Sequence, residues 1–76
     1  MGVFKEILHK TSDGESAVVA WSHLRPQLPG DTDRLRWVAL WRWARETQLL
    51  YAASDLTVGP SGEIASANVV FWADMP

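Results

Sequence analysis

The sequence predicts an α+β fold in which one long amphipathic helix packs on a small antiparallel sheet, in the order ββαββ. Three observations support this fold: two short runs rich in β-branched and aromatic residues, two turn sequences, and one long segment without helix breakers. The chain has 76 residues, which suffice for one hydrophobic core but not two, so residues 1–76 are expected to form a single domain.

The strands are predicted from the turns at residues 11–14 and 59–62, which are rich in Gly, Ser and Asp or Pro. Residues 16–22 and 68–73 contain the β-branched and aromatic runs and are predicted to be strands. Residues 3–10 fit two structures. Their apolar positions match a helical stripe, but the turn that follows favours a hairpin, and a strand here would pair with residues 16–22. We therefore expect a strand.

The long helix is predicted to begin after a linker at residues 25–30, in which two prolines oppose helix formation. Asp31 or Thr32 can cap the helix, and Asp33 places a negative charge in its first turn. Nothing breaks the helix before about Ser54, so we expect a length of roughly 30 Å or more.

One face of this helix is predicted to form the core, and the opposite face is polar but interrupted by apolar residues. The core face comprises Trp37, Ala39, Leu40, Trp43, Ala44, Leu50 and Tyr51. The polar face comprises Arg34, Arg42, Arg45, Glu46 and Gln48. Three apolar residues, Val38, Trp41 and Leu49, lie among them. So small a chain can hardly cover a helix on both sides.

The predicted interface is therefore the apolar stripe on the polar face of the helix. The chain has five tryptophans, and Trp and Arg contribute most of the binding energy in many protein interfaces. Adjacent strand residues point to opposite faces, so either Phe71 or Trp72 should also be exposed. The candidate interface residues are Arg34, Val38, Trp41, Arg42, Arg45 and Trp72. In the alternative interpretation, the N-terminal segment or the 25–30 linker covers Trp41.

Catalytic and metal sites are not predicted, so we expect no enzyme and no cofactor. Cysteine is absent, which excludes disulfides and thiolate sites. His9 and His23 are too few for a structural zinc site, and no serine lies in a nucleophile-elbow motif. The glycines at residues 59–62 lack the lysine of a phosphate-binding loop.

The predicted function is therefore that of a small, non-enzymatic protein-interaction module that binds another protein or a second copy of itself. By analogy of size alone, it would be a regulatory or inhibitor protein of the kind that phages and mobile elements carry. The alternative is a homo-oligomer that encloses an aromatic pocket for a small molecule. Nucleic-acid binding is less favoured, because the net charge is -2. No secretory pattern or membrane span is present, so a cytoplasmic location without a membrane partner is expected.

Overall fold

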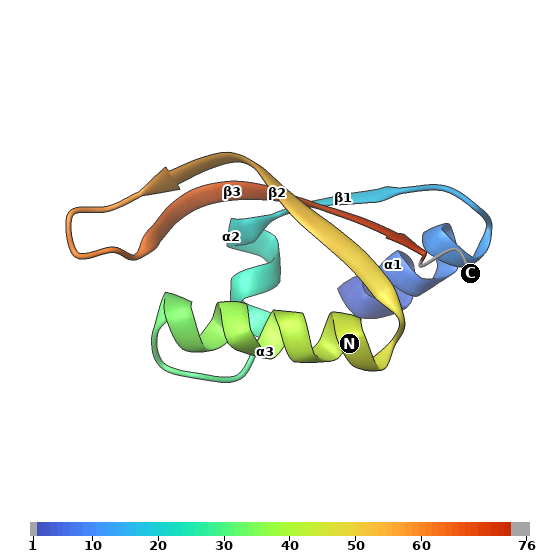
Figure 1. The fold of residues 1–76 in the computed structure, drawn as a ribbon, viewed down its shortest axis with the longest axis horizontal. Helices are drawn as coiled ribbons and strands as arrows, with labels where there is room; N and C mark the ends of the chain where they lie inside the picture. Colours follow the sequence, from blue (N-terminus) through green and yellow to red (C-terminus); the bar gives the residue numbers. More distant parts are fainter. Residues whose placement is uncertain (1, 74–76) are drawn as a thin grey trace.

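The helices lie on one side of a three-stranded antiparallel sheet, as Figure 1 shows. In the computed structural model, which describes residues 2–73, the elements are helix α1 (Gly2–Ser12), strand β1 (Ala17–Ala20), the short helices α2 (Trp21–Leu24) and η1 (Arg25–Gln27), helix α3 (Asp33–Glu46), and strands β2 (Leu49–Val58) and β3 (Ile64–Ala73). The strand order is β1-β3-β2. The predicted α+β class is confirmed, whereas the predicted ββαββ order is wrong.

The segment predicted as the first strand is helix α1. Val3, Phe4 and Ile7 share the buried side of this helix, so the helical stripe in the sequence was the correct signal. The turn that suggested a hairpin ends the helix instead. Gly14 has a φ of 82°, and the amide of Glu15 donates to the carbonyl of Lys10 at 3.0 Å, as in a glycine-terminated helix. Strand β1 therefore pairs with β3 rather than with the N-terminal segment.

The predicted long helix is also wrong, because α3 ends at Glu46 and the chain continues as strand β2. At the end of α3, the hydroxyl of Thr47 donates to the carbonyl of Trp43 at 2.8 Å. Gln48 then adopts a positive φ of 59°, which reverses the chain direction. Residues 49–54 pair with β3 from Ala73 back to Asn68. The pairing with β3 outweighs the high helical propensity of the leucines and alanines in this segment.

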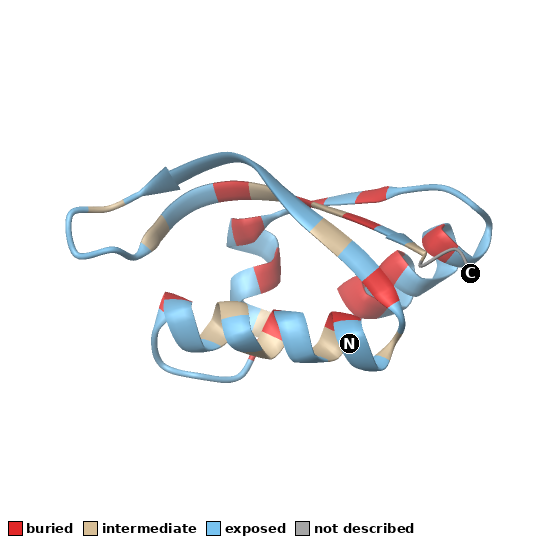
Figure 2. Ribbon diagram, in the orientation of Figure 1, coloured by how far each residue is buried: buried red, intermediate tan, exposed pale blue. Residues whose placement is uncertain are grey.

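The core lies between the sheet and the helices, as the buried residues in Figure 2 show. Leu40 and Ala44 from α3 are buried in it, as predicted, and Trp37, Trp43 and Tyr51 pack against it while partly exposed. The Trp43 ring lies 4.5 Å from that of Phe4 and 5.8 Å from that of Phe71, between centroids. Leu50, which we expected in the core, is exposed because it follows α3 in a strand and points to the outer face of the sheet.

The linker before α3 is held by two arginines. Arg25 Nε lies 3.1 Å from Oδ1 of the buried Asp33, and Arg36 donates to the backbone carbonyls of Arg25 at 2.7 Å and Gly30 at 3.1 Å. Arg36 lies beside the apolar residues of α3, and its side chain turns to the linker rather than to solvent. Thr32 caps the helix, since its hydroxyl accepts from the amide of Leu35 at 3.3 Å.

Gly30→Ala is expected to lower the free energy of unfolding by about 1–3 kcal/mol, because Gly30 has a φ of 112° and an added Cβ would lie 2.9 Å from the Cβ of Leu35. Chemical denaturation measures the change. Gly2→Ala is the matched control, because a Cβ at Gly2 meets nothing within 4 Å. Equal stability of the two variants would contradict the strained geometry at Gly30.

Candidate interaction surface

Five of the six predicted interface residues lie exposed on α3: Arg34, Val38, Trp41, Arg42 and Arg45. Trp41 is 48% exposed, so neither the N-terminal segment nor the linker covers it. Trp72 is 37% exposed but lies on the outer face of the sheet, whereas its neighbour Phe71 is buried. The structure therefore does not bring Trp72 together with the other five.

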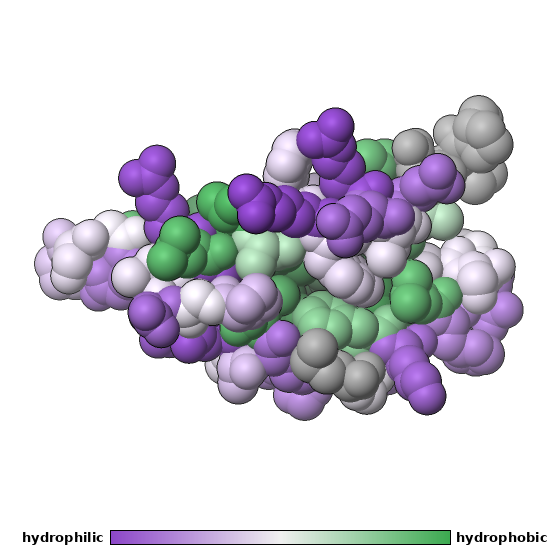
Figure 3. Space-filling view, turned by 90° about the horizontal axis from the view of Figure 1, so that it is seen from below, coloured by the Kyte–Doolittle hydropathy of each residue, from purple (hydrophilic) through white to green (hydrophobic). Residues whose placement is uncertain are grey.

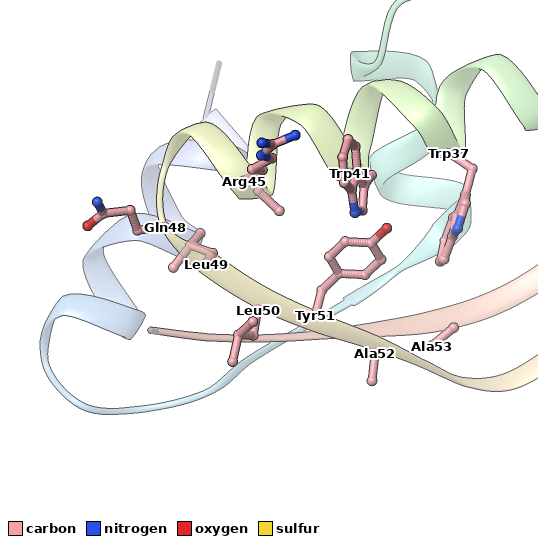
Figure 4. A pocket seen from close by; sticks show the side chains of 10 residues that line it. Trp37, Trp41, Arg45, Gln48, Leu49, Leu50, Tyr51, Ala52 and Ala53 are labelled. Carbon is pink, nitrogen blue, oxygen red and sulfur yellow. The ribbon is translucent and has the colours of Figure 1, made fainter. Parts of the chain in front are cut away.

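The residues on α3 are themselves divided between two sides of the helix. On the side next to β2, Trp41 and Arg45 line a groove of about 540 Å³ between helix and strand. Figure 4 shows Tyr51 pointing from β2 into this groove, with Trp37 and Trp41 reaching toward it from α3. The ring centroids of Trp37 and Tyr51 are 5.4 Å apart. We name this hollow between α3 and β2 the aromatic groove.

Among the residues that the structure describes, Arg45 is the one charged residue that lines the aromatic groove. Its guanidinium lies 5.3 Å from the centroid of the Trp41 ring, within the range of a cation–π contact. This contact restricts the rotamers of both side chains on the surface of α3. The groove therefore combines apolar aromatic surface with a single positive charge.

On the other side of α3, Val38 and Arg42 line a second groove of about 550 Å³, whose walls also include Phe4, Leu28 and Leu35. Figure 3 shows the molecule from below Figure 1, where α3 lies, with apolar residues across the middle of this face and polar residues along much of its border. Arg34 lies elsewhere, in a polar hollow at the start of α3 with Asp31 and Glu63. Two apolar surfaces therefore flank the exposed ridge of α3.

The contribution of β2 to the aromatic groove was not predicted from the sequence. Tyr51 was predicted on a core helix face, but its side chain points into the groove from strand β2, whereas those of Leu50 and Ala52 point away from the groove (Figure 4). Alternation of apolar and polar residues would have indicated a strand here. Residues 49–53 are almost uniformly apolar and show no such alternation. The groove exists only because β2 folds back beside α3.

Burial raises the pKa of the Tyr51 phenol above its ordinary value of 10.0. Tyr51 is the only tyrosine, so phenolate absorbance reports this group alone. The native protein is expected to titrate above pH 10.0 and the denatured protein near it. Because the folded pKa is the higher one, the associated stability is present below pH 10.0 and is lost as the pH rises through the folded pKa. Identical native and denatured midpoints would contradict the burial of Tyr51.

The outer face of the sheet is a separate apolar surface, since all the helices lie on the other side (Figure 1). Val18 of β1 is 62% exposed and Leu50 of β2 is 44% exposed on this face. Trp72 lies opposite Leu50 in the strand pairing. Apolar residues thus run across all three strands on the outer face.

One of the two histidines lies beside a carboxylate on the surface of α1. His9 Nε2 lies 3.4 Å from Asp13 Oδ2, but both side chains stand in solvent on α1. Within residues 2–73, no three His, Cys, Asp or Glu side chains are grouped to hold a metal ion. Over the same residues, no helix has the length and apolar character needed to cross a membrane. No family model, curated protein or solved structure matches the chain.

Proposed function

We propose that the protein is a small non-enzymatic interaction module that binds a protein partner through the exposed surface of α3 and the adjoining aromatic groove. The observation that carries this proposal is the exposed Trp41, which stands on the rim of the groove with Arg45 against its ring. We further propose that the module regulates or inhibits the protein that it binds.

Leaving this apolar surface in water is unfavourable, and a bound partner would remove it from water. A Trp ring offers a large rigid area at a small loss of side-chain entropy, which is why Trp and Arg are enriched among the residues that dominate binding energy. Val38, exposed one turn before Trp41, and the Tyr51 ring across the groove extend the apolar area. Arg42 and Arg45 border it with positive charge, which favours a partner with an apolar centre and acidic rim.

A second candidate function is binding of an aromatic small molecule in the aromatic groove. The observation that favours it is the convergence of Trp37, Trp41 and Tyr51 on one hollow. The hollow is open on one side, so a ligand would be enclosed only if a second protein surface covered it. This candidate therefore requires the oligomer that we expected in the alternative interpretation of the sequence.

The proposed function is tested by affinity capture from the native host, with the wild-type chain, Trp41→Ala and Leu56→Ala as three parallel baits. Leu56 is also apolar and half exposed, but it lies in the hairpin away from α3. A partner retained by the wild type and Leu56→Ala but lost by Trp41→Ala supports the proposal. A partner retained equally by all three contradicts the assignment of the surface to α3.

A further inference from the structure

Within residues 2–73, the first half of strand β2 is a sheet edge on which no further strand pairs. The strand order leaves β1 and β2 on the two edges, and an edge strand presents unpaired backbone N–H and C=O groups on its open side. β1 is protected by its length of four residues. Beyond Ser54, β2 is protected by a bulge in its pairing with β3 and by Asp55, which adopts a φ of 53°. Residues 49–54 contain no charge, proline or bulge.

Apolar side chains flank this edge on both faces of the sheet. On the inner side, the aromatic groove runs along residues 49–53 of β2. On the outer side, Leu50 and Ala52 are exposed beside Trp72 and Val70 of β3. A strand added to this edge would therefore satisfy backbone hydrogen bonds and also remove apolar surface from water on both faces.

We propose that residues 49–54 of β2 pair in antiparallel orientation with the same residues of a second copy of this chain. The result is a continuous sheet of six strands, three from each copy. This inference deepens the proposed function, on which it rests, by naming a partner for the groove side of the interaction surface.

The charges favour antiparallel pairing of two identical strands. Asp55 is the only charged residue of β2, and Arg45, the charged residue of the groove, lies at the opposite end of the strand, beside Leu49 and Leu50. Antiparallel pairing brings Asp55 of each copy toward the Arg45 end of the other. Parallel pairing in register would place the two aspartates side by side, which is unfavourable.

The side-chain sizes select a register with Ala52 on the two-fold axis. Directly opposed residues in an antiparallel pair point to the same face of the sheet. A two-fold axis between the two copies must therefore pass between one residue of β2 and the same residue of the second copy. With Ala52 in that position, Tyr51 lies opposite Ala53, and Leu50 lies opposite Ser54. Each bulky side chain then faces a small one, and the smallest pair occupies the crowded centre.

The test is the mass of the full chain in solution, measured by sedimentation equilibrium over the micromolar range. We expect twice the chain mass of 8.5 kDa for the wild type and the monomer mass for Ala52→Lys and for Ala52→Glu, because each places like charges together on the axis. An equimolar mixture of the two variants should recover the dimer. Ala20→Lys, an exposed alanine on the other edge strand, is the matched control and should remain dimeric.

Three results would overturn the inference: a monomeric wild type, a dimer that persists in both Ala52 variants, or a mixture that stays monomeric. Circular dichroism verifies that each variant is folded. A monomeric wild type that still loses a captured partner on Trp41→Ala leaves the proposed function intact. A dimer broken by Trp41→Ala but not by Ala52→Lys assigns self-association to α3 and contradicts pairing through β2.

Discussion

Leu40→Ala is expected to lower the free energy of unfolding by about 2–5 kcal/mol, which is enough to unfold much of so small a domain. Leu40 is 0% exposed at the centre of α3, and truncating it leaves a cavity between the helix and the sheet. Leu35→Ala is the matched control, because Leu35 is 54% exposed on the same helix and should change stability by about 0.5 kcal/mol or less. Chemical denaturation of both variants measures the difference.

Trp43→Ala should destabilise the domain by a similar amount, about 3–5 kcal/mol. The Trp43 ring joins α1 to β3 through its contacts with Phe4 and Phe71, so its loss removes packing on both sides. Because the Trp43 side chain is partly exposed, we expect the loss of unfolding free energy to lie toward the lower end of that range. Near-native stability of both Leu40→Ala and Trp43→Ala would mean that α3 presents a different face to the core.

Trp41→Ala is expected to have the opposite profile, with little change in stability and a large loss of binding. The Trp41 ring is half exposed, and its one aromatic or cation contact within residues 2–73 is with Arg45, so few packed neighbours lose contacts. Affinity for a partner bound on α3 should fall by about 2 kcal/mol or more, roughly thirtyfold in Kd. Calorimetry or surface plasmon resonance with the captured partner measures this loss.

The control variants for Trp41 are Arg42→Ala and Arg45→Ala. Both should weaken binding less than Trp41→Ala, and their effects should shrink as salt is added, because rim charges steer association more than they hold a complex. The share of tryptophan fluorescence that acrylamide quenches should fall in Trp41→Ala, since an exposed ring has been removed. A stability loss equal to that of Trp43→Ala, with unchanged binding, would place Trp41 in the core and contradict the proposed surface.

The predictions that depended on local patterns were the most successful. The start of α3 follows from its cap at Thr32 and the two prolines before it, both of which act within a few residues. The buried positions Leu40 and Ala44 follow from helical periodicity. The opposite orientations of Phe71 and Trp72 follow from the pleat of a strand.

The predictions that failed depended on which segments meet in space. The glycine at position 14 serves equally in a hairpin turn or at a helix end, and only the packing of α1 on the core distinguishes them. The apolar run at residues 49–53 is compatible with a helix or a strand, and only the presence of β3 beside it makes it a strand.

The sequence by itself determined the α+β class, the core face of α3 and the residue types that stand exposed on it, because these follow from periodicity, capping and composition. The tertiary structure decided where α3 ends, which strands pair, and hence that Tyr51 faces Trp37 and Trp41 across a groove. Trp72 was separated from the other candidates for the same reason, since it alternates with the buried Phe71 along β3 and therefore points away from the core. Strand pairing joins residues far apart in the chain, and no local pattern specifies the partner.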